Sequence, residues 1–170
     1  VTVTVSATTP HIDFALPRGG HLSGTVTEAT SGTPIQFAWV TVYDANGSRM
    51  GSASSGADGR YTVGAGLPTG TYHVQAGASE QVPQWYGGTD CLFNCAVTES
   101  TPVPVTAGAT AGGIDFALHP GGRIRGHITD AATGAALDAQ YFDIGVYSAG
   151  GSYVTSADTA DVDGSFSIGG

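Results

Sequence analysis

The chain has 170 residues and a formal net charge of −9, and all five of its basic residues are arginines. A chain this acidic repels phosphate backbones, which argues against nucleic acid as a partner. It has no run of 18 apolar residues and no sustained apolar stripe at helical spacing, so we expect neither a membrane span nor a helical bundle.

The first predicted element, residues 1–19, repeats a segment from the middle of the chain. Residues Ile12–Gly32 and Ile114–Gly134 share 11 identities in 21 aligned positions at an offset of 102, which indicates a tandem repeat. We expect IDFAL at 114–118 to close one module, and the identical residues 12–16 to form an orphan strand that closes another. The apolar residues predicted to bury this strand in a partner are Val1, Val3, Val5, Ile12, Phe14 and Leu16.

Residues 20–118 are predicted to form one complete β-sandwich module. Apolar and polar residues alternate through several short segments, which is the period of strands with one buried face. Turn signals recur roughly every 8–12 residues, and Asn46-Gly47 and Asp58-Gly59 are the clearest of them. In the segment at 37–43, one face carries Ala38, Val40 and Val42 and the other carries Phe37, Trp39, Thr41 and Tyr43. In the other segments, the residues that share a face are Leu22, Gly24 and Val26, then Tyr61 and Val63, then Tyr72, Val74 and Ala76, and finally Ile114, Phe116 and Leu118.

The two cysteines of the chain, Cys91 and Cys95, are four positions apart. A structural zinc ion needs four ligands and this pair supplies two, so a disulfide is the preferred interpretation. A disulfide indicates an oxidising compartment outside the cytoplasm. The loop that it closes is so small that the stabilisation is only about 2 kcal/mol in the chain-entropy model, and we expect the bond to stiffen the loop locally.

Residues 79–102 interrupt the alternation and are predicted to form a long loop around the cysteines. Long ordered loops often carry function, and this one holds Trp85, Tyr86 and Phe93. Exposed aromatic rings on a stiffened loop would stack on a sugar or hold a partner, so a glycan is a candidate ligand. The favoured alternative is that Trp85 and Tyr86 are mostly buried, against the end of the sandwich or the following module.

Residues 119–170 are predicted to form an incomplete second module. VYDANG and ADGRYTV of the first module return as VYSAGG at Val146–Gly151 and VDGSFSI at Val162–Ile168. Counterparts of LPTGTYHVQA and of the closing strand IDFAL do not follow within residues 119–170. We therefore expect an open sheet edge and an uncovered core in this half of the chain.

The remaining polar residues form no recognisable catalytic or metal-binding pattern. The five histidines are scattered, without H-E-x-x-H or H-x-H, and are predicted to lie on the surface. Asp158, Asp161 and Asp163 resemble part of a calcium loop, but the terminal glutamate of that loop is absent, which favours a turn. Asn46 lies in a glycosylation sequon, at a position where the hairpin itself requires Asn-Gly. We expect no cofactor and no metal.

The combined pattern resembles the carboxypeptidase regulatory-like domain, which groups with the Cna-B-type domains of bacterial secreted and surface proteins. The motifs G-x-V-T-[ED]-x-x-[ST]-G-x-P-I, V-x-V-Y-D-x-x-G, D-G-x-Y-x-V and L-P-x-G-T-Y-x-V carry the resemblance. They lie at Gly24–Ile35, Val40–Gly47, Asp58–Val63 and Leu67–Val74, and again at Gly126–Leu137 and Val146–Ile168. The resemblance implies an all-β fold of tandem immunoglobulin-like or transthyretin-like sandwiches. Some Cna-B-type domains carry a Lys–Asn isopeptide cross-link, which this chain cannot form because it has no lysine.

We expect a non-catalytic extracellular structural protein: a repeat-built filament, stalk or adhesin segment on the cell surface. The orphan strand and the incomplete module predict head-to-tail assembly by strand complementation. The partner is then either another copy of the chain or a neighbouring repeat of a longer one. The alternative is an accessory module of a larger secreted hydrolase, with carbohydrate as its ligand.

Overall fold

The computed structural model of the chain describes residues 1–92, 95–137, 144–157 and 163–169. Its regular structure is almost entirely β, with one 3-10 turn, η1, at Val97–Glu99. The strands are β1 Gly20–Glu28, β2 Trp39–Tyr43, β3 Arg49–Ser54, β4 Arg60–Leu67, β5 Gly70–Gly77, β6 Gln84–Trp85, β7 Thr89–Asp90, β8 Val103–Val105, β9 Thr110–Ala111, β10 Phe116–Leu118, β11 Arg123–His127, β12 Ile144–Tyr147, β13 Tyr153–Ala157 and β14 Ser165–Gly169.

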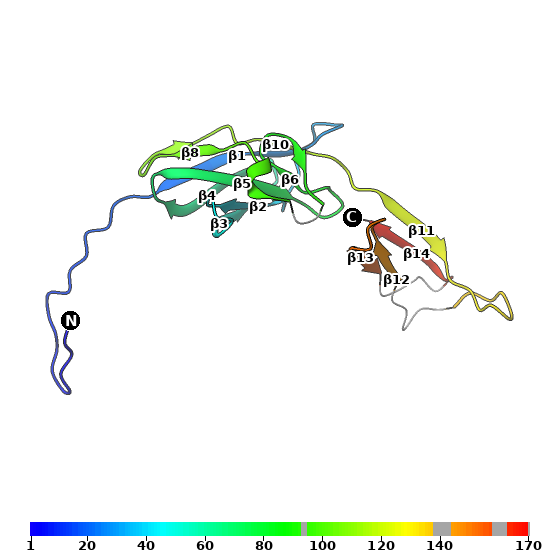
Figure 1. Cartoon of the computed structure of the whole chain (residues 1–170), viewed down its shortest axis with the longest axis horizontal. Coiled ribbons are helices and arrows are strands. Elements are labelled where there is room, and N and C mark those ends of the chain that lie inside the picture. Colours follow the sequence, from blue (N-terminus) through cyan, green and yellow to red (C-terminus); the bar gives the residue numbers. More distant parts are fainter. Residues whose placement is uncertain (93–94, 138–143, 158–162, 170) are drawn as a thin grey trace.

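Strands β1 to β10 form a β-sandwich, which we call the first sandwich (Figure 1). One sheet has the order β10-β1-β4, with β9 also paired to β1. The other has the order β3-β2-β5-β6-β7, with β8 paired to β5. The all-β fold predicted from the alternating segments is therefore present.

The core of the first sandwich lies between the inner faces of these two sheets. Side chains alternate across each strand, so every second residue of β1, β2 and β5 enters the core. Burying one Val, Leu or Phe side chain contributes about 1.5–3 kcal/mol. The fully buried large residues are Leu22, Val26, Val40, Val42, Val63, Leu67, Val74 and Leu118.

The segment around Ile114 closes the first sandwich along the free edge of β1. Strand β10 runs parallel to β1, with Val26 beside Phe116. The hydroxyl of Tyr61 donates a hydrogen bond of 2.6 Å to the carbonyl oxygen of Ile114, and burial raises the pKa of this hydroxyl. Gly24 permits the close approach, because a Cβ at this position would lie 2.0 Å from the same carbonyl oxygen.

Strands β11 to β14, which we call the C-terminal strand pairs, reproduce two pairing registers of the first sandwich. Gly126 lies opposite Phe166 in the β11–β14 pair, as Gly24 lies opposite Tyr61 in the β1–β4 pair. Strand β12 pairs with β13 as β2 pairs with β3, and in both hairpins the register shifts just before the tyrosine, Tyr147 or Tyr43. The same residue pattern therefore forms the same local pairings in both halves of the chain.

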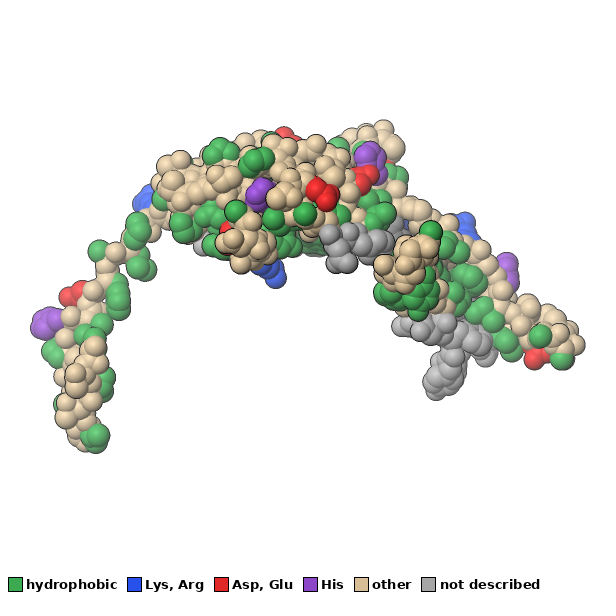
Figure 2. Space-filling model, in the orientation of Figure 1, with side chains coloured by type: hydrophobic (Ala, Val, Ile, Leu, Met, Phe, Trp, Pro, Cys, Tyr) green, Lys and Arg blue, Asp and Glu red, His purple; other side chains and the backbone are tan. Residues whose placement is uncertain are grey.

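Residues 1–19, which we call the N-terminal segment, form no strand and extend away from the first sandwich (Figure 1). Apolar side chains lie exposed along it (Figure 2). The exposed fractions are 91% for Val1, 77% for Val3, 93% for Val5, 45% for Ile12, 81% for Phe14 and 85% for Leu16. The sequence predicts that these residues are buried in a partner module. In the single chain they are exposed, because no described strand pairs with them.

The two equivalent glycines should respond differently to alanine. Gly24→Ala forces a Cβ into the Ile114 carbonyl oxygen, and we expect a loss of about 3 kcal/mol in the free energy of unfolding. Gly126→Ala meets only the far end of the Phe166 ring, which can move, so the loss should be under about 1 kcal/mol. Urea unfolding followed by circular dichroism measures both. Equal losses would contradict the assigned closing contact.

Candidate functional site

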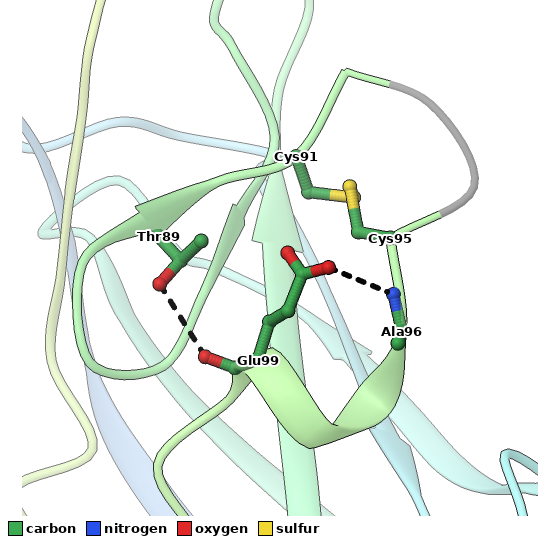
Figure 3. Close-up of a disulfide and its surroundings, with 5 residues drawn as sticks. All are labelled: Thr89, Cys91, Cys95, Ala96 and Glu99. Atoms are coloured by element: carbon green, nitrogen blue, oxygen red, sulfur yellow. Dashed lines mark hydrogen bonds between the residues drawn. A yellow bond between two sulfur atoms is a disulfide. The ribbon is translucent and has the colours of Figure 1, made fainter.

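Cys91 and Cys95 form a disulfide in the segment that follows β7 (Figure 3). This confirms the pairing predicted from their spacing. Cys91 is buried, and its backbone N–H donates a 2.6 Å hydrogen bond to the carbonyl oxygen of Pro83. On the other side of the bond, the Glu99 carboxylate accepts a hydrogen bond from the backbone N–H of Ala96. The disulfide is thus held between the backbone just before β6 and the turn η1.

The prediction of a long irregular loop over residues 79–102 is wrong in part. This segment contains β6 and β7, which extend the larger sheet, and the turn η1. Gln84 and Trp85 of β6 pair with Ala76 and Gln75 of β5. Strands of two residues are too short to show an alternating pattern in the sequence. They are recognised only in the structure, where β6 pairs with the edge of β5.

Trp85 is buried, with 3% of its surface exposed, and it is not available to stack on a ligand. Its ring packs edge-on against Tyr43, with 5.5 Å between the ring centroids, on the outer face of the larger sheet. Tyr86 is half-buried and lies edge-on against Phe116 at 6.0 Å, at the margin of the core. Phe93 lies outside the described residues. The two described aromatic residues therefore pack on the sandwich itself.

The outer face of the larger sheet is covered where β2 and β5 run side by side. A cavity of about 340 Å³ there is lined by Tyr43, Gln75, Trp85, both cysteines and Val97, so the disulfide segment lies over this face. His73, the cross-strand neighbour of Tyr43, is buried on the same side. The prediction that all histidines lie on the surface is wrong for His73, because strand alternation gives its direction but not what covers it.

The described part of the segment that resembles a calcium loop is a hairpin turn. The Asp163 carboxylate accepts a 2.9 Å hydrogen bond from the backbone N–H of Ser165, as Asp58 does from Arg60 at 3.1 Å. Hydrogen bonding to Ser165 holds the pKa of Asp163 below its usual value. Asp158 and Asp161 lie outside the described residues. Elsewhere in the described chain, no three His, Cys, Asp or Glu side chains are grouped to hold a metal ion.

The C-terminal strand pairs leave apolar surface uncovered. Ile124 of β11 is 50% exposed, whereas its counterpart Leu22 of β1 is 0% exposed. A cavity of about 290 Å³ lies at this face, and its apolar lining residues are Leu92, Ile124, Val146, Val154 and Ile168. Strand β14 pairs along one edge of β11, and no described strand pairs along the other. Among the described residues, the C-terminal strand pairs therefore have both an uncovered apolar face and an unpaired strand edge.

Several contacts between the two halves were not foreseen in the sequence. Glu80 forms an ion pair with Arg123, and Gln81 forms an isolated bridge with Pro120. Leu92, beside the disulfide, reaches the cavity of the C-terminal strand pairs. The residues involved are far apart in the sequence and form no motif. The one sequence feature that could have indicated such a contact is an apolar residue in an irregular segment, such as Leu92. Among the described residues, no helix has the length and hydropathy to cross a membrane.

Removing the disulfide should destabilise the chain modestly. We expect the double variant Cys91→Ser and Cys95→Ser to lose about 2 kcal/mol in the free energy of unfolding, because the unfolded chain regains the entropy of a small loop. Urea unfolding of the variant and of the unreduced parent measures the difference. Unchanged stability would show that the bond does not hold the segment in place.

The two tryptophans provide a test of burial against ligand binding. Trp85→Ala should cost about 3–5 kcal/mol, because it leaves a cavity between β6 and Tyr43. Trp39→Ala is the control, since Trp39 is partly exposed, and it should cost about 1 kcal/mol. Circular dichroism during urea unfolding measures both. If Trp85→Ala left stability unchanged and abolished binding on a glycan array, the carbohydrate-binding alternative would replace a packing role.

Comparison with known proteins identifies the family of the central part of the chain. The carboxypeptidase regulatory-like domain matches residues 21–119. A comparison with curated protein sequences finds no match.

Solved structures show distant similarity. The Bacillus anthracis TIE protein is 16% identical with a TM-score of 0.38, and the match covers 88% of this chain and 25% of that protein. A streptococcal ancillary pilin is 12% identical with a TM-score of 0.45, covering 89% of this chain and 50% of the pilin. The shaft pilin SpaA of Lactobacillus rhamnosus GG is 13% identical with a TM-score of 0.35, covering 91% and 82%. The chain therefore spans half or less of the first two structures that it matches.

These structural similarities are too low to carry an argument about function. The family match is different, because it covers more than half of the 170 residues and includes all of β2 to β10 and all of β1 except Gly20. The chain belongs to the carboxypeptidase regulatory-like domain family.

Proposed function

We propose that this chain is part of a non-catalytic extracellular structural protein, in which β-sandwich repeats are joined head to tail by strand complementation. The N-terminal segment serves as a closing strand for an incomplete module of the kind formed by residues 119–170. The partner is another copy of the chain or a neighbouring repeat. The disulfide between Cys91 and Cys95 supports an oxidising, extracytoplasmic location.

A single observation carries this proposal: the same sequence, IDFAL, occurs once buried and once exposed. At residues 114–118 its apolar side chains Ile114, Phe116 and Leu118 are at most 5% exposed, in the closed first sandwich. At residues 12–16 the equivalent Phe14 and Leu16 are more than 80% exposed. Exposed apolar surface of this extent, on a segment with strand pattern, is typical of a protein–protein contact.

The proposed role is mechanical and needs no bound ligand. Strand addition at a sheet edge supplies backbone hydrogen bonds, and the apolar residues of the strand supply the hydrophobic contact. A head-to-tail contact of this type does not close on itself, so it produces a linear array. Without lysine the chain cannot use a Lys–Asn cross-link, and its joints then depend on strand pairing and burial.

Two exposed phenylalanines give a matched test. Phe14→Ser should weaken self-association of the full chain, because about 2 kcal/mol of Phe burial is lost, equal to roughly a thirtyfold weaker association. Phe37→Ser removes a side chain of similar exposure, 75% against 81%, outside the proposed contact, and should leave association unchanged. Sedimentation velocity over a concentration series measures both variants.

Deleting residues 1–16 should abolish the association. If the unsubstituted chain associates and this deletion or Phe14→Ser leaves the association unaltered, strand complementation is not the joint. A parent chain that stays monomeric throughout the concentration series would contradict self-assembly.

A further inference from the structure

The resemblance between the two ends of the first sandwich extends beyond IDFAL. At the same offset of 102, residues 1–16 align without a gap to residues 103–118, with 10 of 16 positions identical. Residues 103–118 contain β8, β9 and β10, which together we call the closing segment of the first sandwich. Residues 1–16 therefore match the whole closing segment and not only its last strand. Val1 and Val3 correspond to the buried residues Val103 and Val105 of β8.

The backbone of the N-terminal segment repeats the shape of the closing segment. Ser6 and His11 have positive φ angles of 62° and 61°, at the positions of Gly108 and Gly113, whose φ angles are 81° and 75°. Positive φ is uncommon outside glycine, so this agreement at two positions is specific. The turn hydrogen bond from Ala109 N–H to the Thr106 carbonyl, 3.0 Å, recurs from Ala7 to Thr4 at 3.2 Å. The segment thus carries the turns of a closing segment without a sheet beside it.

The position that this segment would occupy can be read from the first sandwich. There the closing segment runs parallel to β1 and pairs with both of its ends, through β9 and β10. Strand β11 is the counterpart of β1, and its edge opposite β14 has no described partner. The equivalent pairings place Phe14, Ala15 and Leu16 beside Ile128, Thr129 and Asp130, and Thr8 and Thr9 beside Arg123 and Ile124.

We propose that residues 1–16 of one copy bind along the free edge of β11 in a second copy, parallel to it, with Ala15 beside Thr129. This inference rests on the proposed function and adds the acceptor edge, the orientation and the register. The free edge of β12, the place that β5 takes beside β2, is not the site, because residues 1–16 have the sequence of β8 to β10 and not of β5.

Contacts of the first sandwich define what would hold the joint. The Asp115 carboxylate accepts hydrogen bonds of 2.8 Å from the backbone N–H and the hydroxyl of Thr25. The corresponding pair is Asp13 and His127, where the backbone N–H is kept and an imidazole replaces the hydroxyl. The joint therefore retains a carboxylate anchor at the C-terminal end of β11.

Apolar contacts of the joint follow from the same correspondence. Phe116 packs on Tyr61 with ring centroids 6.4 Å apart, and Phe14 would pack on Phe166 in the same way. A Cβ at Gly20 would lie 2.4 Å from Cγ1 of Val105, and Gly122, the counterpart of Gly20, lines the open cavity of about 290 Å³. Val3, the counterpart of Val105, therefore enters that cavity and covers part of its apolar lining.

A steric variant tests the acceptor edge. In the proposed register the Ile12 carbonyl of the incoming segment lies against Gly126, as the Ile114 carbonyl lies against Gly24. Gly126→Ala should weaken self-association of the full chain by about tenfold or more, while its melting temperature changes little. Gly150→Ala is the control, because a Cβ at Gly150 would meet only the Ser148 hydroxyl at an ordinary contact distance of 3.9 Å, and Gly150 is not on β11. Unweakened association of a folded Gly126→Ala variant overturns the proposed edge.

Cysteine cross-linking between two different full-length chains tests the register. Neighbouring strands lie about 5 Å apart, and a shift of two residues increases the Cα separation to about 8 Å, beyond the reach of a disulfide. One chain carries Ala15→Cys and the other Thr129→Cys, with Ala131→Cys as the shifted control. After mild oxidation, peptide mass spectrometry should find the 15–129 cross-link about tenfold more often than the 15–131 cross-link.

The outcomes separate this inference from the function on which it rests. If the chain associates but the 15–129 cross-link does not exceed the 15–131 cross-link, the register is wrong, while strand complementation by residues 1–16 still stands on its own deletion test. If the unsubstituted chain stays monomeric and neither cross-link forms, this inference and the self-assembly of the chain both fail. A dominant 15–129 cross-link together with the loss of association in Gly126→Ala supports both.

Discussion

The first sandwich depends on the pairing of strand β1 along both of its edges. Strand β4 takes one edge, and the segment that contains β9 and β10 takes the other. At the centre of this arrangement the Ile114 carbonyl lies against Gly24 and accepts a hydrogen bond from the buried Tyr61 hydroxyl. Backbone polar groups left unpaired within a buried sheet are costly, so the first sandwich needs its closing segment as well as its core.

The described part of the second half of the chain shows counterparts of β1 to β4 and no counterpart of that closing segment. Strand β11 pairs with β14 in the register of the first sandwich, and even the turn glycine is repeated, with φ of 78° at Gly164 and 73° at Gly59. Ile124 is nevertheless half exposed where Leu22 is fully buried. The pairing of neighbouring strands depends on their own residue pattern. The burial of a side chain such as Ile124 also requires further strands that cover it, and the described residues do not supply them.

The disulfide segment connects the two halves of the molecule. It adds two short strands to the larger sheet, lies over the outer face of that sheet beside Tyr43 and Gln75, and brings Leu92 to the apolar cavity of the C-terminal strand pairs. The Glu80–Arg123 ion pair lies at the same junction, with both side chains partly exposed, so its contribution to stability is small. The segment packs on the first sandwich and contacts the C-terminal strand pairs, and its tryptophan Trp85 is buried.

The sequence by itself determined the all-β class, the repeat, the turns at Asn46-Gly47 and Asp58-Gly59, the disulfide and the family. These features depend on neighbouring residues or on a fixed spacing, so alternation, turn chemistry and cysteine separation express them directly. Only the tertiary structure decided that β6 and β7 extend a sheet, that His73 is buried, and that Leu92 faces β11. Each of these depends on which distant strand lies beside a residue, and two residues with the same local pattern, such as Leu16 and Leu118, then have opposite exposure.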